Sequence, residues 1–139
     1  MRFKILTLLS AVCTLFGCHT EKTTATEQLS LSKPTFRSVE VDEFEKAIAD
    51  PDVVRLDVRR ADEYADGHIK DALNIDVLED SFEAKACSTL PKDKVVALYC
   101  RSGRRSKKAA EILSAKGYEV VELNTGYLGW TGAGKATTK

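Results

Sequence analysis

Short apolar runs alternate along the chain with segments whose apolar positions recur at helical spacing. The apolar runs are typical of β-strands, and they lie at residues 36–39, 53–58, 72–75, 95–99 and 118–123. The segments typical of helices lie at residues 41–49, 62–65, 78–87, 106–116 and 126–130. This alternation predicts an α/β domain with a parallel sheet of about five strands, flanked by helices and joined by right-handed crossovers.

The run Val95–Tyr99 is followed by one cysteine, Cys100, and then by a basic loop that contains a glycine. The run is β-branched and apolar, as in a strand buried on both faces. Beyond the loop, Ser106 can cap the start of a helix and Gly117 can end it. A strand that enters a helix through such a loop aims backbone N–H groups at one point, which suits an anion or a thiolate.

The residues around Cys100 are of the kind that activate a thiol. A thiol is a nucleophile as its thiolate, and helix N-termini and cations lower the reference thiol pKa of about 8.5. Residues 100–108 contain no acidic side chain and five basic ones: Arg101, Arg104, Arg105, Lys107 and Lys108. Gly103 lets the loop turn without a Cβ in front of its N–H groups. The alternative is a buried strand-end cysteine beside a solvated helix start, but the combination favours a nucleophilic Cys100.

Other polar residues follow predicted strands. The carboxyl ends of parallel strands share one edge of the sheet, where α/β folds build their sites. Asp57 lies near the end of the second run, and Arg59 and His68 come after it. We therefore expect Asp57, Arg59, His68 and Cys100 to lie toward the same edge.

The first 17 residues are typical of a secretory signal. A basic start, Met1 to Lys4, precedes an almost wholly apolar run from Ile5 to Phe16. Twelve helical residues span about 18 Å, which is too short for a bilayer core of about 30 Å. The end of this segment, residues 15–18, resembles the lipobox of bacterial lipoproteins, which implies lipidation of Cys18 and an exported, periplasmic, membrane-anchored protein. The alternatives are a plain signal peptide cut further on and an uncleaved anchor.

The remaining chain divides by composition. Residues 18–35 are polar and predict a flexible tether, residues 36–134 a single folded domain, and residues 135–139 a frayed tail. The formal charge is zero, or −2 without residues 1–17, and this argues against a general nucleic-acid binder. Without the leader and with Cys18 lipidated, Cys87 and Cys100 are the free thiols; we expect Cys87 to be packed or semi-exposed.

Two ordered blocks of residues resemble the rhodanese family. The first block comprises Leu56-Asp57-Val58-Arg59, Glu63-Tyr64, Gly67-His68-Ile69, Ala72 and Asn74-Ile75. The second comprises the loop from Tyr99 to Ser106, followed by Gly117-Tyr118-Glu119-Val120, Gly126-Tyr127 and Trp130. The resemblance covers roughly residues 36–134, the size of one such domain. Lys70-Asp71 and Thr125-Gly126 depart from the family pattern, at turns away from the loop.

The resemblance implies a three-layer fold and a sulfurtransferase that uses no cofactor or metal. Cys100 would be the nucleophile and carry a persulfide, and the sulfur or anion would be held by the rest of the loop: Arg101, Ser102, Gly103, Arg104, Arg105 and Ser106. Arg101, with Arg104 or Arg105, would attract the anionic donor. The partners implied are a small anionic sulfur donor and a thiol or protein acceptor, with the protein a monomer.

The same resemblance makes Asp57, Arg59 and Glu63 scaffold ion-pair residues behind the site. The alternative for them is a surface salt bridge, which contributes little to stability. For His68 the family pattern implies a structural role, and direct proton transfer is the alternative.

Two other functions remain open from the sequence. A cysteine phosphatase or an arsenate reductase needs an arginine six residues after the cysteine, to bind a tetrahedral anion bidentately. Here that residue is Ser106, and arginines stand at the fourth and fifth positions. The second alternative is a sulfur-carrier module that accepts sulfur from a partner without turnover of its own.

Overall fold

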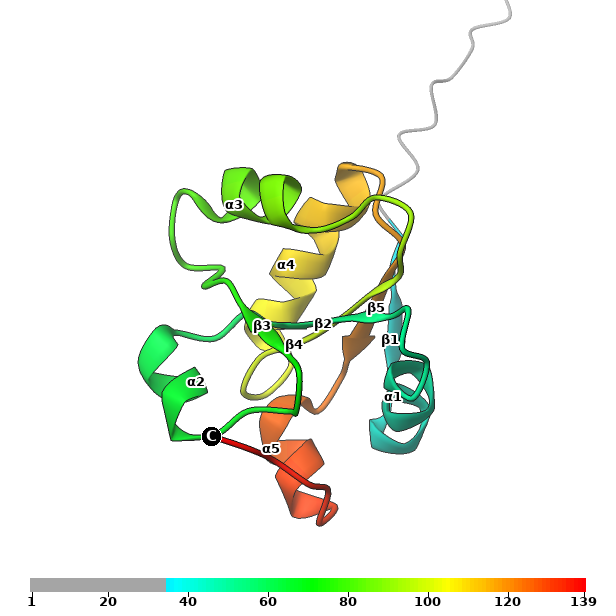
Figure 1. Ribbon diagram of the computed structural model, residues 1–139, viewed down its shortest axis with the longest axis vertical. Helices are drawn as coiled ribbons and strands as arrows, with labels where there is room; N and C mark the ends of the chain where they lie inside the picture. The colour runs from blue at the N-terminus through cyan, green and yellow to red at the C-terminus, as the bar shows by residue number, and fades with distance from the viewer. Residues whose placement is uncertain (1–34) are drawn as a thin grey trace, which may run out of the picture. The chain divides into compact units, whose positions relative to one another are not determined.

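The computed structural model describes residues 35–139, which form a parallel sheet with helices on both faces (Figure 1). The strands are β1 (Arg37–Val39), β2 (Val54–Asp57), β3 (Leu73–Asn74), β4 (Val96–Tyr99) and β5 (Val120–Leu123). The helices are α1 (Val41–Ile48), α2 (Ala61–Asp66), α3 (Phe82–Thr89), α4 (Arg104–Ala115) and α5 (Gly126–Gly132). The α/β class and the five-stranded parallel sheet predicted from the sequence are confirmed. The predicted leader and Cys18, with the tether up to residue 34, lie outside the described residues.

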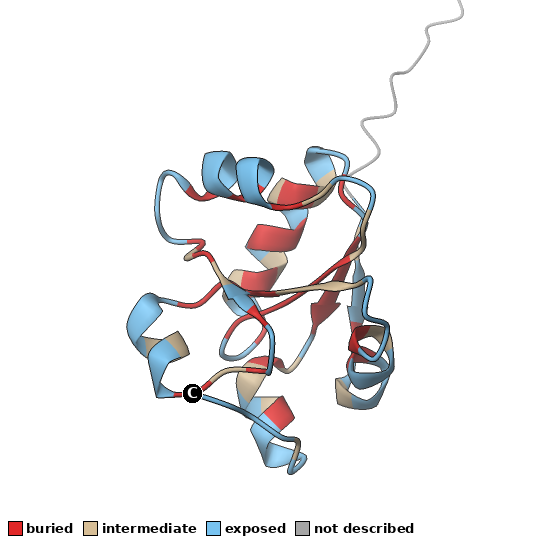
Figure 2. Ribbon diagram, viewed as in Figure 1, coloured by how far each residue is buried: buried red, intermediate tan, exposed pale blue. Residues whose placement is uncertain are grey.

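The strand order β1-β5-β4-β2-β3 places β4 at the centre of the sheet. All four residues of β4 are fully buried, because two separate apolar clusters cover its two faces (Figure 2). Helices α3 and α4 cover one face, and α1 and α5 cover the other (Figure 1). The strand that carries Cys100 at its end therefore lies in the close-packed interior of the domain.

The register of the sheet aligns the ends of three strands. Asp57 at the end of β2 lies opposite Asn74 of β3 and opposite Tyr99 of β4. Cys100 follows Tyr99 directly, and Arg59 lies two residues beyond Asp57. The common carboxyl edge expected from the sequence thus brings the first half of the domain next to the cysteine loop.

Helix α4 begins earlier than the sequence predicts. Ser106 was expected to cap it, but the helix begins at Arg104 after Gly103, whose φ of 91° is in the left-handed region. Glycine adopts this conformation at little cost, so the chain turns into the helix without a side-chain cap. Ser106 instead lies buried in the first turn, where its hydroxyl is free for other partners.

Helix α3 also differs from its predicted bounds of 78–87. The chain from Asp76 to Ser81 forms turns, and the Leu78 N–H donates to the Asp76 carboxylate at 2.8 Å. Such side-chain turns compete with helix formation, so α3 starts only at Phe82. The short turn segment leaves Leu78 exposed beside the cysteine loop.

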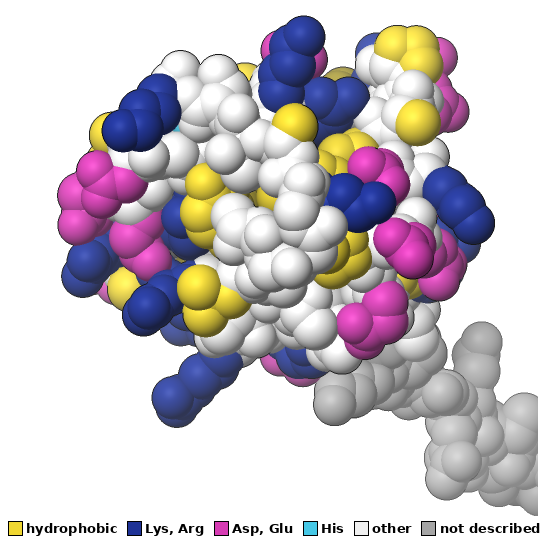
Figure 3. All heavy atoms as spheres, turned by 90° about the horizontal axis from the view of Figure 1, so that it is seen from below, with side chains coloured by type: hydrophobic (Ala, Val, Ile, Leu, Met, Phe, Trp, Pro, Cys, Tyr) yellow, Lys and Arg dark blue, Asp and Glu magenta, His cyan; other side chains and the backbone are white. Residues whose placement is uncertain are grey.

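The C-terminal residues 135–139, expected to fray, are held against the domain. Thr138 exchanges two backbone hydrogen bonds of 2.9 Å with His68, and the Trp130 indole N–H donates to the Ala136 carbonyl at 2.9 Å. Lys135 also forms an ion pair with Glu45 of α1 at 2.5 Å. Figure 3 shows the face with α5, where acidic and basic side chains are interspersed. Pairing of its backbone, rather than apolar burial, holds this tail in place.

Candidate active site

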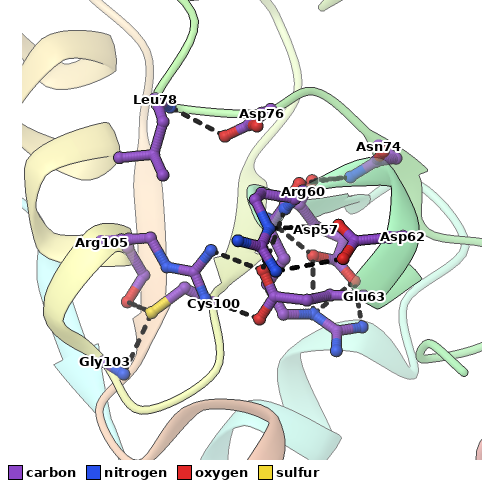
Figure 4. Close-up of polar contacts among 12 residues, drawn as sticks. Asp57, Arg60, Asp62, Glu63, Asn74, Asp76, Leu78, Cys100, Gly103 and Arg105 are labelled. Atoms are coloured by element: carbon purple, nitrogen blue, oxygen red, sulfur yellow. Dashed lines mark hydrogen bonds and ion pairs between the residues drawn. The ribbon is translucent and has the colours of Figure 1, made fainter. Parts of the chain in front are cut away.

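The Cys100 sulfur lies inside the curve of the loop that leads into α4 (Figure 4). Cys100 is 1% exposed, and its Sγ accepts a hydrogen bond from the Gly103 N–H at 3.1 Å. A Cβ on Gly103 would lie 1.9 Å from the Asn124 carbonyl oxygen, so only glycine fits this position. The backbone N–H and the start of a helix both favour negative charge on this sulfur.

Helix α5 holds the loop from behind. The Tyr127 N–H donates to the Cys100 carbonyl at 2.7 Å, and the Leu128 N–H donates to the Arg101 carbonyl at 3.0 Å. Gly126 permits this approach, because a Cβ there would lie 2.6 Å from the Arg101 carbonyl. These contacts fix the two peptide planes that follow the nucleophile before any ligand binds.

Asp57 and Arg59 form a buried ion pair at the adjacent strand end. Their side chains are 0% and 4% exposed, and the guanidinium Nη2 lies 2.6 Å from the Asp57 carboxylate. Arg59 also donates to the Gly67 carbonyl at 2.7 Å and lies 4.1 Å from the centre of the Tyr127 ring. Burial alone would lower the pKa of Arg59, but the hydrogen bonds and charge of Asp57 outweigh it and raise that pKa. This pair is therefore not a surface salt bridge, and it braces the loop through Tyr127.

A second ion pair, Glu63 with Arg105, spans the mouth of the site. Two hydrogen bonds of 2.7 and 2.8 Å join the guanidinium of α4 to the carboxylate of α2 (Figure 4). The hydrogen bond from Arg105 is the main reason that the pKa of Glu63 falls to about 2. Arg105 is thus already paired, whereas Arg101 and Arg104 are exposed and have charge available for a ligand.

Two cavities open beside the loop, and Arg101 lines both. The smaller, of about 240 Å³, is lined by Arg59, Glu63, Asp66, Gly67, Arg101, Tyr127 and Leu128. The larger, of about 560 Å³, is lined by Leu78, Arg101, Ser102, Arg104, Arg105 and Lys108. The larger cavity has four cationic side chains and no acidic one, so it attracts anions toward the loop.

His68 has the contacts of a structural residue. Its ring stacks on Tyr64 with centroids 3.7 Å apart, and its Nδ1 lies 3.0 Å from the Tyr64 carbonyl oxygen. Its backbone pairs with Thr138, and none of its hydrogen bonds reaches Cys100. These contacts agree with the structural role that the family pattern implies for His68.

Sequence reasoning missed Glu122. This β5 residue is fully buried, and it accepts hydrogen bonds from Ser106 at 2.6 Å and from Ser38 at 2.5 Å. Ser106 Oγ in turn lies 3.4 Å from Cys100 Sγ. One signal was available: a carboxylate inside the apolar run 120–123 must be buried with partners if that run is a central strand.

The loop does not provide the anion clamp of a cysteine phosphatase. The sixth residue, Ser106, has its hydroxyl bound to Glu122 inside the domain, and the fifth, Arg105, is bound to Glu63. Neither group is available to hold a tetrahedral phosphate bidentately. Within residues 35–139, no group of three or more potential metal ligands is present, and no helix is long and apolar enough to cross a bilayer.

Comparison with known proteins supports this distinction. The model of the rhodanese-like domain family matches residues 40–133. The putative sulfurtransferase YtwF of Bacillus subtilis is 35% identical over 94 residues, which cover 66% of this chain and 85% of YtwF. The thiosulfate sulfurtransferase PspE of Escherichia coli is 41% identical over 67 residues, which cover 48% of this chain and 64% of PspE.

A solved structure agrees in fold. The rhodanese-related protein of Thermoplasma volcanium superposes with a TM-score of 0.66 at 29% identity, over 74% of this chain and 98% of that protein. The chain belongs to the rhodanese-like domain family. The predicted class, a sulfurtransferase enzyme, is confirmed by these relatives.

Proposed function

We propose that this sulfurtransferase moves sulfane sulfur from thiosulfate, or a related small dianion, through a persulfide on Cys100. The observation that carries the proposal is the position of Sγ, which accepts the Gly103 N–H at 3.1 Å at the start of α4. The name of the relative PspE, a thiosulfate sulfurtransferase, supports the choice of donor. Exposed Arg101 and Arg104 supply the charge that a dianionic donor needs on approach.

In the first half-reaction, the Cys100 thiolate attacks the outer sulfur of thiosulfate. A new S–S bond forms at Cys100, the original S–S bond breaks, and its electron pair leaves with sulfite. The product is an anionic persulfide, so the total charge is unchanged and no proton is required in this step. The loop N–H groups and the N-terminus of α4 stabilise the charge on the terminal sulfur.

In the second half-reaction, a nucleophilic acceptor removes the terminal sulfur. Cyanide or a thiolate attacks that sulfur, the persulfide S–S bond breaks, and the electron pair returns to Cys100 as the thiolate. Covalent catalysis of this kind splits the transfer into two steps. The cavity of about 560 Å³ leaves space for an acceptor larger than cyanide.

Steady-state kinetics with thiosulfate and cyanide test this function. We expect thiocyanate as product and parallel double-reciprocal plots, because donor and acceptor react in separate steps. Intersecting plots, or no thiocyanate from correctly folded protein, would contradict the proposal. Phosphate release from phosphoesters would support the phosphatase alternative instead.

We also propose that the protein is exported and anchored to a membrane through a lipid on Cys18. The proposal is based on the basic start, the apolar run and the lipobox-like residues 15–18 of the sequence. The expected result is recovery in the membrane fraction with diacylglycerol on Cys18, lost in the Cys18→Ala variant. A soluble protein whose N-terminus begins beyond residue 18 would contradict it.

A further inference from the structure

A buried chain of polar groups runs inward from Cys100. Cys100 Sγ lies 3.4 Å from Ser106 Oγ, and Ser106 Oγ lies 2.6 Å from Glu122 Oε1. Ser106 and Glu122 are both 0% exposed and Cys100 is 1% exposed. The three groups therefore exchange protons with one another more directly than with solvent.

The hydrogen bonds depend on the protonation state of the sulfur. A serine hydroxyl has one proton to donate, although it can accept two hydrogen bonds. While Cys100 is a thiol, it donates to Ser106, and Ser106 donates to the Glu122 carboxylate. When Cys100 is a thiolate, the hydroxyl is needed by the sulfur, and an ionised Glu122 would lose the 2.6 Å hydrogen bond from Ser106 to Oε1 and keep there only the longer contact of 3.4 Å with Lys107.

We propose that Glu122 takes up the Cys100 thiol proton through Ser106 and holds it while the sulfur is anionic. The S–H bond breaks as the Ser106 oxygen takes that proton, and the original Ser106 proton passes to Glu122 Oε1. The result is a thiolate that accepts from Ser106 and a neutral carboxyl that donates to Ser106. One negative charge moves from Glu122 to the sulfur, so the transfer itself does not place two negative charges in the buried cluster.

The groups around Glu122 suit both protonation states. Ser38 donates to the other oxygen, Oε2, which remains an acceptor when Oε1 is protonated. Lys107 Nζ lies 3.4 Å from Oε1 but also contacts the Gly103 carbonyl at 3.3 Å and the Asn124 side-chain oxygen at 2.9 Å. Lys107 therefore keeps acceptors when Glu122 becomes neutral.

We call the proton path from Cys100 through Ser106 to Glu122 the relay. The other charged pair near it keeps its ion pair during the transfer. On the outer side of Cys100, Arg105 of α4 faces the loop and is bound to Glu63 of α2. The remaining hydrogen-bond partner of Glu122, Ser38 of β1, is uncharged. The protonation of Glu122 is therefore the change that compensates an anionic sulfur from inside the domain.

The relay closes over a full turnover. Glu122 stays protonated while Cys100 is a thiolate and then an anionic persulfide, and it returns the proton after the acceptor has removed the sulfur. Glu122 acts through Ser106 and is a positioning residue, whereas Ser106 touches the reacting sulfur. The inference rests on the proposed function only in taking Cys100 as the nucleophile.

The pH dependence of Cys100 alkylation tests the relay without any sulfur donor. The full-length protein is treated with iodoacetamide, a neutral reagent, and the rate at Cys100 is read from its peptide by mass spectrometry. Two groups that share a proton titrate in two macroscopic steps, so we expect a plateau between two rises in the wild type. Glu122→Gln leaves Cys100 without the group that shares its proton, so this variant should show one rise and no plateau.

Matched variants separate the relay from a structural role. Glu119→Gln makes the same change at an exposed residue just before β5 and should keep both rises. Ser106→Ala should remove the plateau as Glu122→Gln does, and Ser106→Thr, which retains a hydroxyl, should restore it. A two-step profile that survives in Glu122→Gln or Ser106→Ala would overturn the proposal, as would a single rise in the wild type.

Infrared difference spectra give an independent readout on the persulfide form. After thiosulfate treatment, we expect a carboxylic-acid C=O band to appear in the wild type and in Glu119→Gln, but not in Glu122→Gln. Protein shown by mass to carry the persulfide but lacking this band would overturn the relay. If no persulfide forms, the proposed function fails instead, and the alkylation profile alone decides the relay.

Discussion

The two sides of Cys100 differ in almost every physical respect. The outer side has exposed cations, Arg101 and Arg104, above a cavity open to solvent. The inner side has a buried hydroxyl and a buried carboxylate, Ser106 and Glu122, with no solvent contact. Charges on the outer side are screened by salt, whereas those on the inner side are not. In the function and the proton transfer that we propose, the outer side governs approach of the donor and the inner side governs the proton of the thiol.

The largest expected effect comes from removing the sulfur that both sides share. Cys100→Ser should reduce sulfur transfer to background, because a serine hydroxyl cannot form the persulfide, and the fold should stay near native. The control is Cys87→Ser, which changes the other free thiol of residues 35–139, an exposed one. The measurement is thiocyanate production, and loss of activity in Cys87→Ser alone would show that the nucleophile is misassigned.

The next largest effect comes from the loop backbone and not from the side chains on either side of Cys100. Gly103→Ala puts a Cβ 1.9 Å from the Asn124 carbonyl oxygen, so the loop must move and the N–H on Sγ is displaced. Misplacement by about 1 Å costs roughly a hundredfold in rate, which is the decrease we expect in kcat/KM for thiosulfate. Gly117→Ala is the matched control, because Gly117 also has a positive φ but no atom within 4 Å. Equal activity in the two variants would contradict the assigned role of Gly103.

A smaller effect, on stability, comes from the ion pair at the mouth of the site. Glu63 has a pKa lowered to about 2 by Arg105, so the pair stabilises the fold above the ordinary carboxyl pKa. This contribution should be lost as the pH falls from about 5 to about 2, where Glu63 becomes protonated. Glu63→Gln should lower the free energy of unfolding at pH 7 by about 2 kcal/mol and flatten that acid dependence.

The control for this pair is an exposed carboxylate of the same kind. Glu43 lies 3.5 Å from Arg37 with both side chains more than half exposed, so Glu43→Gln should change stability by less than about 1 kcal/mol. Denaturant unfolding across this pH range measures both variants. An acid dependence that is the same in Glu63→Gln as in the wild type would show that the pair contributes little.

The smallest effect distinguishes the outer side from the inner one. Neutralising Arg101 and Arg104 by substitution with glutamine should slow the step with dianionic thiosulfate a few-fold and slow transfer to a monoanionic thiolate acceptor less. Raising the salt from 0.1 to 1 M shortens the screening length from about 10 Å to about 3 Å and should reproduce this slowing in the wild type. Stopped-flow rates for the separate half-reactions measure both. If the rate of the donor step changed neither with salt nor in these arginine variants, the prediction would be wrong. The loop N–H groups alone would then bind the anion.

The same comparison explains what the sequence could predict. The sheet, its order of elements and the edge with Cys100 follow from apolar periodicity and the chirality of parallel crossovers. The basic loop is local, so its charge and its glycine are visible in the sequence. The cations and the glycine of the loop could therefore be predicted from the sequence alone.

The inner side depends on contacts between distant segments. Ser106 meets Glu122 sixteen residues away, so this pair does not follow from local spacing. The same holds for one contact of the outer side, where Arg105 meets Glu63 at a separation of 42. The sequence predicts Ser106 as a helix cap because serine is a common cap, but the left-handed Gly103 starts the helix without one. The tail likewise has no apolar pattern, and its pairing with His68 depends on the finished fold.

The persulfide itself is the most direct test of the account. Full-length protein mixed with thiosulfate, digested without reductant and analysed by mass spectrometry should show one added sulfur, about 32 Da, on the peptide that contains Cys100. Cyanide should remove this sulfur and yield thiocyanate in equal amount. An added sulfur on the Cys87 peptide instead, or thiocyanate formed in turnover with no adduct on Cys100, would contradict the central claim that Cys100 carries the transferred sulfur.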